Sequence, residues 1–193
     1  MPFWREAPLS EVERELIDLL FEAHDKAARR ANLSATAIKQ GAQAGVPFTQ
    51  AIIAGLATLG GSHGPVERTH DFYNEPDITM AVYRCLAAGQ KVPGFGSSFR
   101  KDDDPQWAHV KAWFEKHRPD LAGLIRCARC ALKVHGKDLA PNPASYTALT
   151  AIALGIPRDI ASWLFVSARL SAWAETYLVH ADGASTKPHK VAE

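Results

Sequence analysis

Helix start and stop signals recur at short intervals along the whole chain, and this punctuation limits the fold more than any other feature. Ser10 with Glu13 forms a capping-box pattern, and glycines or prolines close the apolar stretches that follow such starts. No segment shows the alternation of polar and β-branched apolar residues that is typical of strands. The sequence therefore predicts an all-α protein of about eight or nine helices.

Nine segments carry helical patterns, and one of them is apolar nearly all round. The expected helices are residues 10–31, 34–44, 47–59, 65–73, 77–88, 104–116, 119–136, 142–155 and 157–180. The nearly all-round apolar character of the 47–59 helix is typical of a helix at the centre of a core or in a dimer interface. His24 lies on or near the apolar stripe of the first helix and is expected to be a partly buried packing histidine. The tail, 181–193, is expected to be flexible.

Composition narrows the class of partner. The 193-residue chain has a formal net charge of +1, which gives no general attraction for nucleic acid or for a membrane. No apolar run approaches the roughly 20 residues that cross a bilayer, and the first residues are too charged for a secretory signal. Three cysteines fit a reducing compartment. We therefore expect a cytoplasmic protein that binds neither nucleic acid nor membrane.

Cys127 and Cys130 form a C-x-x-C pair that has two interpretations. The first is a metal or redox site, but no second pair exists and a structural zinc ion takes about four ligands. The second is that the i, i+3 spacing places two small apolar residues on one helix face. The second interpretation is favoured, and no metal site is expected.

Three stretches combine glycine or proline with polar residues. In the first, Gly60 and Gly61 close the apolar helix and are followed by His63, which either binds a ligand or caps that helix. In the second, residues 91–97 form a glycine-rich turn. In the third, residues 141–144 begin a helix, and the chain continues to Arg169.

Together the three stretches resemble the citrate synthase superfamily, which includes citryl-CoA lyases. The family patterns are Gly-Pro-x-His-Gly-Gly, then Pro-Gly-Phe-Gly-His with Asp-Pro-Arg, then Pro-Asn-Val-Asp with Gly-Ile-Pro and an arginine. The matching stretches are residues 60–64, 93–97, 104–106, 141–144, 155–157 and Arg169.

The resemblance covers about residues 10–180 and implies a two-lobed helical fold with a trimmed large lobe. Residues 1–64 and 145–180 would form the large, dimerisation lobe, and residues 65–144 the small, CoA-binding lobe. The family is dimeric through helices that flank its first histidine. A homodimer is therefore expected, with the 47–59 helix at its interface.

The resemblance also assigns roles to single residues. His63 would hydrogen-bond the thioester carbonyl oxygen and stabilise an enolate. The second family histidine is Ser97 here, and the aspartate that moves the α-proton is Ala144. Arg169 would bind a substrate carboxylate, since a guanidinium can hold one with two hydrogen bonds. Two of the three catalytic groups are thus missing from this chain.

Two further positions belong to the substrate site that the resemblance implies. Lys39 matches a family arginine or histidine and would bind a carboxylate. Gln106 stands where the family has a carboxylate-binding arginine. Four other residues are candidates for replacing the missing groups: Glu67, His70, Tyr73 and Tyr146.

CoA is the co-substrate that the resemblance implies, and no tightly bound cofactor is expected. The backbone of the glycine-rich turn would contact its adenine and pantetheine, and two cations would meet its phosphates. The residues concerned are Val92, Gly94, Gly96, Arg100 and Lys101. Local pairing of the two cations with residues 102–104 is an equal alternative.

Three functions remain open. The first is a C–C lyase or acyl-transferring synthase, like a citryl-CoA lyase, that acts beside a CoA thioester or related carbonyl of a carboxylic acid. The second is a non-catalytic relative that binds an acyl-CoA or organic acid, or a regulatory subunit of a complete paralogue. The third is a site rebuilt for a substrate other than CoA.

Overall fold

The computed structural model describes residues 6–30, 32–60, 65–96 and 104–181, and these ranges contain helices and no strand. The all-α prediction is therefore confirmed. Ten α-helices and two 3-10 helices are described: α1 (Glu11–Ala28), α2 (Leu33–Gln43), α3 (Phe48–Ala57), α4 (Val66–Tyr73), α5 (Ile78–Ala87), η1 (Pro105–Trp107), α6 (Ala108–His117), α7 (Pro119–Val134), α8 (Pro143–Leu154), η2 (Arg158–Ile160), α9 (Ser162–Ser167) and α10 (Leu170–Ala181).

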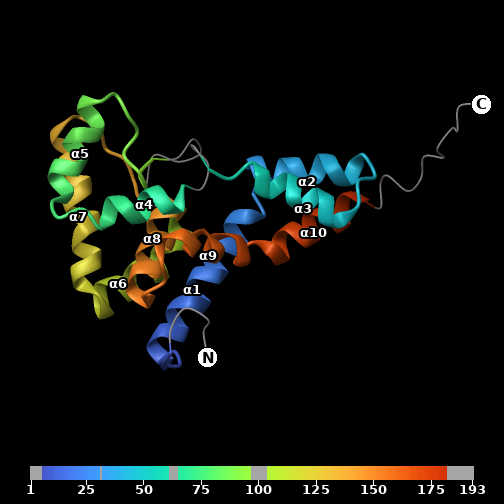
Figure 1. Cartoon of the computed structure of the whole chain (residues 1–193), viewed down its shortest axis with the longest axis horizontal. Coiled ribbons are helices and arrows are strands. Elements are labelled where there is room, and N and C mark those ends of the chain that lie inside the picture. The colour runs from blue at the N-terminus through green and yellow to red at the C-terminus, as the bar shows by residue number, and fades with distance from the viewer. Residues whose placement is uncertain (1–5, 31, 61–64, 97–103, 182–193) are drawn as a thin grey trace, which may run out of the picture.

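The helices form two groups that share α1. Helices α2, α3 and α10 lie side by side at one end of the molecule, and α4 to α9 form the larger body at the other end (Figure 1). Helix α1 contacts α8 and α6 in the larger body and α10 in the three-helix group. The predicted boundaries of the two lobes, 1–64 with 145–180 and 65–144, stay a prediction.

Local signals place most helix ends where the sequence predicts them. The Ser10 side chain accepts from the Glu13 amide while the Glu13 carboxylate accepts from the Ser10 amide, so the capping box is present. Asn142 caps α8 by accepting from the Ala144 amide, and Gly155 ends that helix with φ of 66°. Helix α8 therefore begins and ends where the sequence signals predict.

Two apolar clusters form the core, and α8 lies within the larger one. Its side chains from Ala144 through Ala151 are all buried, which is why this helix has no polar face. The smaller cluster joins α1, α2 and α10 through Ala28, Ile38, Ala172 and Trp173. Among the helices described, none combines the length and apolarity that crossing a bilayer requires.

The prediction of one long helix over 157–180 is wrong. The chain forms η2, α9 and α10 there, with a break at Ala168 and Arg169. No glycine or proline marks this break. Its cause is tertiary packing, because Phe165 belongs to the larger cluster and Trp173 to the smaller one.

Helix α3 is not a core helix of this chain. Only Ala51 and Gly55 are buried along it, whereas Phe48 is 44% exposed and Ile53 is 58% exposed. The prediction that this helix lies at the centre of a core is therefore wrong for the single chain. The interface interpretation stays a prediction.

Candidate functional site

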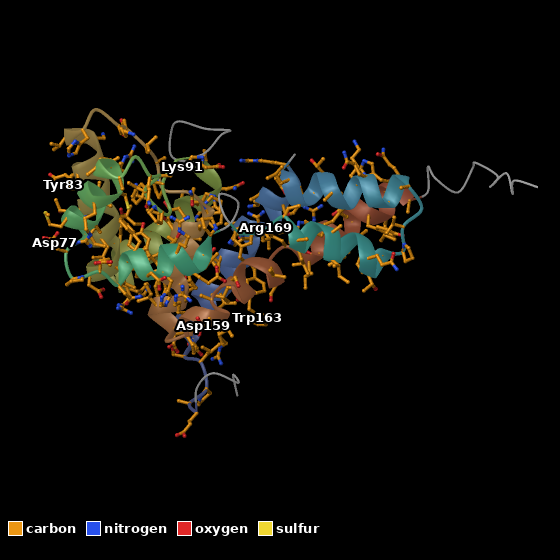
Figure 2. The ribbon with its side chains drawn as sticks, turned by 45° about the horizontal axis from the view of Figure 1, so that its top comes forward. Asp77, Tyr83, Lys91, Asp159, Trp163 and Arg169 are labelled. Carbon is orange, nitrogen blue, oxygen red and sulfur yellow. The ribbon has the colours of Figure 1, made fainter. Side chains whose placement is uncertain are left out.

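Arg169 is a buried cation at the break between α9 and α10, where the two groups of helices meet (Figure 2). Arg169 is 4% exposed, and its guanidinium carbon lies 3.9 Å from the centre of the Phe165 ring. No carboxylate in the described part of the chain forms an ion pair with it. Burial lowers the pKa of Arg169 to about 9, so the side chain is still charged at neutral pH. A buried charge without a counter-ion is costly, and an anionic ligand would remove that cost.

His24 on α1 is the hydrogen-bond partner of this guanidinium. The Arg169 Nε donates to His24 Nδ1 over 3.1 Å, so the ring proton of the neutral imidazole must lie on Nε2. Nε2 in turn lies 2.7 Å from the Thr147 hydroxyl, which donates to the Pro143 carbonyl. Every polar atom of the ring is thereby satisfied.

The environment of His24 keeps the imidazole uncharged. The residue is fully buried, and its ring meets the edges of Trp107 and Phe165 at centroid distances of 5.0 and 4.8 Å. Burial, with a further contribution from the Arg169 charge, holds the pKa of His24 well below its ordinary value. A neutral histidine can accept from Arg169, whereas a protonated one would repel it.

The loop before α8 ties this site to the glycine-rich turn. The Asn142 amide donates to the Gly94 carbonyl over 2.9 Å, and the Asn142 side chain donates to the Gly96 carbonyl over 3.1 Å. The Gly96 amide donates to the Ala140 carbonyl. Thr147 lies on α8, the helix that Asn142 caps, so α8 connects the turn to the His24–Arg169 pair.

Gly94 sits where only glycine fits. Its φ is 80°, and an added Cβ would lie 2.8 Å from Cγ2 of Thr69. The Ser145 hydroxyl donates to the Gly94 carbonyl and accepts from the Tyr73 hydroxyl. Burial raises the pKa of Tyr73 above its ordinary value, so this phenol is a structural donor in the described geometry.

The structure positions only some of the predicted site residues. Four of them lie outside the described residues: His63, Ser97, Arg100 and Lys101. Val92 and Gly94 are buried and Gly96 is half-buried, all in the turn that α8 holds. Arg169 is the predicted carboxylate ligand that contacts this network.

The other two predicted carboxylate ligands lie in different surroundings. Lys39 is exposed on α2. Gln106 is half-buried directly before Trp107, and its Oε1 is buried without a hydrogen-bond partner. That orphaned acceptor would suit a ligand hydroxyl or amide donor better than a carboxylate.

Among the four candidate replacements, Tyr73, Tyr146 and His70 each contact another side chain, and Glu67 is half-buried on α4. Tyr146 is buried and stacks on Trp107 at 5.2 Å. His70 is half-buried, bonds to Asn74, and has its pKa lowered chiefly by burial. Ala144, which the resemblance aligns with the family aspartate, is 2% exposed and carries only a methyl group.

Sequence reasoning missed the role of His24. The residue was expected to be a partly buried packing histidine, but it is fully buried and bonds to a cation 145 positions away in the chain. A histidine on an apolar stripe gives no local signal of such a partner. Cys127 and Cys130 do share a face of α7, but both are exposed, so they are not part of its packed face.

Sequence comparison identifies the family. Residues 3–188 match the family model described as citrate synthase, C-terminal domain. A 2-methylcitrate synthase of Shewanella oneidensis is 28% identical over 118 residues, which are 59% of this chain and 32% of that protein. The chain thus spans about a third of the length of this curated relative.

Solved structures share the fold. Citryl-CoA lyase from Hydrogenobacter thermophilus matches with a TM-score of 0.74 at 18% identity, covering 97% of this chain and 78% of the lyase. The citrate synthase of Thermoplasma acidophilum, in a ternary complex with carboxymethyl coenzyme A and oxaloacetate, matches with a TM-score of 0.74 at 21% identity. That match covers 99% of this chain and 54% of the synthase. With nearly its whole length matched by the family model and by these folds, the chain belongs to the citrate synthase family.

Proposed function

We propose that this protein makes or cleaves a C–C bond beside a CoA thioester, or a related carbonyl, of a carboxylic acid substrate. The observation that carries the proposal is the buried, charged Arg169 without a carboxylate partner among the described residues. A substrate carboxylate would be the missing counter-ion. The family to which the chain belongs contains enzymes that act on such acids.

The hydrogen bond to His24 prepares Arg169 for this role. It holds Nε and so fixes the plane of the guanidinium, leaving the two terminal nitrogens as donors for a carboxylate. His24 is held in turn by Thr147, so the fork is oriented by α1 and α8 together. Preorganised donors of this kind lower the cost of binding an anion.

The missing catalytic groups favour cleavage over condensation. Ala144 cannot take an α-proton, and general acid–base help is typically worth about 100- to 10,000-fold. In cleavage, the substrate hydroxyl would give its proton to water, the C–C bond would break as the alkoxide becomes a carbonyl, and the enolate that leaves would take a proton from water. His63 would stabilise that enolate and Ser97 would donate a hydrogen bond to the substrate.

The glycine-rich turn would hold CoA in this proposal. Its carbonyls at Gly94 and Gly96 are fixed by Asn142 and Ser145, so the backbone is rigid where a thioester chain would lie along it. Arg100 and Lys101 would meet the phosphates. CoA acts here as a co-substrate and not as a resident cofactor.

A second copy of the chain would cover α3. The exposed side chains of Phe48 and Ile53 leave a large apolar face, and such faces mark interaction sites. Leu178 and Val179 on α10 extend the exposed apolar surface of the same helix group. We therefore propose a homodimer through α3, in keeping with a cytoplasmic enzyme.

One observation favours a second function. The methyl group of Ala144 is buried at the start of α8, where an acid–base residue would have to stand. A non-catalytic protein that binds an acyl-CoA or an organic acid, or a regulatory subunit of a complete paralogue, needs no such group. A site rebuilt for a substrate without CoA is the third reading.

Thermal-shift measurements separate these functions. The protein is screened with CoA, acetyl-CoA, citrate and citryl-CoA, and a ligand of the native state raises Tm according to its concentration relative to Kd. Stabilisation by citrate and CoA, with release of CoA from citryl-CoA, supports the enzyme. Stabilisation without turnover supports the binding protein, stabilisation by citrate alone supports the rebuilt site, and no stabilisation supports the subunit.

A further inference from the structure

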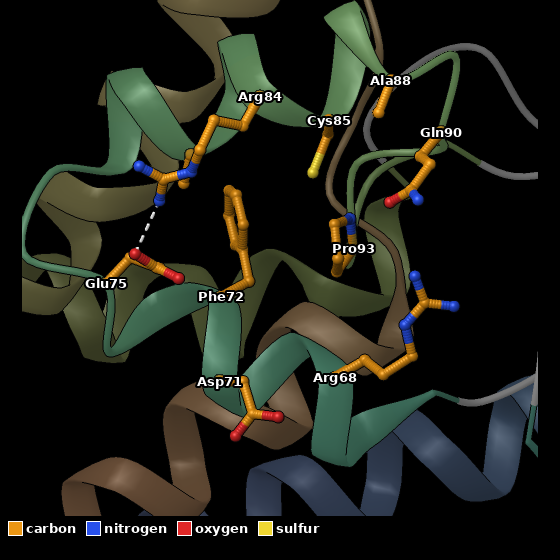
Figure 3. Close-up of a pocket in the computed structure, with 10 residues that line it drawn as sticks. Arg68, Asp71, Phe72, Glu75, Arg84, Cys85, Ala88, Gln90 and Pro93 are labelled. Carbon is orange, nitrogen blue, oxygen red and sulfur yellow. Dashed lines mark hydrogen bonds and ion pairs between the residues drawn. The ribbon is translucent and has the colours of Figure 1, made fainter.

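A cavity of about 410 Å³ opens between α4, α5 and the segment that leads into the glycine-rich turn (Figure 3). None of the residues around Arg169 and His24 lines it. Its apolar lining consists of Phe72, Ala81, Cys85, Ala88 and Pro93, and its polar lining of Arg68, Asp71, Glu75, Arg84 and Gln90. The cavity has the size of a small-molecule site and combines an apolar floor with a polar rim.

One cation of the rim has no ion-pair partner among the residues that the structure describes. Arg84 donates to Glu75 over 2.7 Å, and Asp71 pairs with Arg158, which lies outside the cavity, over 2.6 Å. Arg68 forms no ion pair with any residue that the structure describes. Its guanidinium is directed toward Gln90 (Figure 3).

The Cys85 thiol on the floor does not supply the missing negative charge. Burial raises the pKa of Cys85, against the opposing influence of Arg68 and Arg84, so the thiol is protonated at neutral pH. Its sulfur points into the cavity from α5 (Figure 3). The floor therefore offers apolar contact, and the Cys85 thiol is not a counter-ion for Arg68.

We propose that this cavity binds a compact organic monocarboxylate. Its carboxylate would accept from the Arg68 guanidinium and the Gln90 amide, and its apolar body would lie against Phe72 and Pro93. Glu75 at the rim, although paired, disfavours a second negative charge on the ligand. The ligand thus differs from the polycarboxylic substrate proposed for Arg169.

Cys85 provides a direct readout of occupancy. Replacing Cys127 and Cys130 with serine leaves Cys85 as the only thiol, because the chain has three cysteines and those two are exposed. The rate of alkylation of Cys85 by iodoacetamide is followed by mass spectrometry with benzoate, with its neutral analogue benzamide, and with inorganic phosphate. At benzoate concentrations of ten times Kd, alkylation slows about tenfold, because only the empty fraction reacts.

Variants of the rim test the recognition of charge. Arg68→Gln abolishes protection by benzoate, Arg68→Lys retains part of it, and Arg14→Gln, which removes an exposed arginine of α1, retains all of it. Arg169→Met also retains it, so this site can fail or succeed independently of the proposed function. Equal protection by benzamide or by phosphate overturns the proposal, as does no protection or protection that survives in Arg68→Gln.

Discussion

Nε of Arg169 donates a hydrogen bond to Nδ1 of His24 over 3.1 Å, joining residues 145 positions apart in the chain. Both side chains are buried, one charged and the other neutral. The pair brings the break between α9 and α10 against α1 and, through Thr147, against α8. A protein rarely buries a cation with only a neutral partner, and the pair is the strongest sign of an anion site in the described residues.

Replacing Arg169 with methionine is expected to abolish stabilisation by citrate. Methionine fills a similar volume without a charge, so the variant cannot bind the citrate carboxylate through this side chain. The ligand-free variant also no longer buries a cation. Its own Tm should change little, because relief of the buried charge is offset by the loss of the hydrogen bond to His24 Nδ1. Thermal shifts of the parent, Arg169→Met and the exposed control Arg126→Met give the comparison, and full retention of the citrate shift in Arg169→Met would remove Arg169 from the site.

His24 should make the protein less stable in acid. Its folded pKa lies well below the ordinary 6.5, so its contribution is fully present above pH 6.5 and is lost as the pH falls further. Each such proton gives a slope of up to about 1.4 kcal/mol per pH unit. Urea unfolding of His24→Gln should show a flatter pH dependence below 6.5 than the parent. The exposed control His109→Gln should keep the parent's slope, and identical slopes in all three proteins would contradict the prediction.

Gly94→Ala should cost much more stability than Gly89→Ala. Both glycines have positive φ, 80° and 66°, so both substitutions carry backbone strain of about 1–2 kcal/mol. Only at Gly94 would the new methyl group also meet Thr69 and Ser145, which adds roughly 1–3 kcal/mol. Urea unfolding measures the difference, and equal losses in the two variants would mean that the turn can move away from α8.

Ile53→Glu should dissociate the homodimer. A carboxylate at the exposed centre of α3 would be buried without a partner in the interface. Sedimentation velocity should show a dimer for the parent and a monomer for Ile53→Glu. Val134→Glu, at an exposed valine of α7, should remain dimeric, and a parent that is monomeric throughout would refute the interface.

Local signals account for the part of the fold that could be predicted. The Ser10 capping box, the Asn142 cap and the stop at Gly155 depend on neighbours within a few residues, so they can be recognised in the sequence alone. The break at Arg169 could not be predicted, because the competition between two distant apolar clusters determines it. Phe165 and Trp173 each satisfy the pattern of a continuous helix.

The candidate site was predictable where a motif carries it and hidden where only geometry does. Gly94 and Gly96 could be recognised as a glycine-rich turn that matches a family pattern, and the structure gives both a positive φ, which favours glycine. Arg169 was found through the family pattern. His24 was not, since its hydrogen bond to Arg169 is a property of how α1 crosses the start of α10.

Because α9 and α10 are separate helices, the side chains of α10 can change their direction without any change in those of α9. One residue added at the start of α10 would rotate every later side chain by about 100° and move Trp173 off Ile38, yet Phe165 would stay on His24. The same addition inside α9 would instead displace the guanidinium from the imidazole. The number of residues in α9 and the number in α10 are therefore constrained by different contacts. In one continuous helix, a single set of contacts would constrain both.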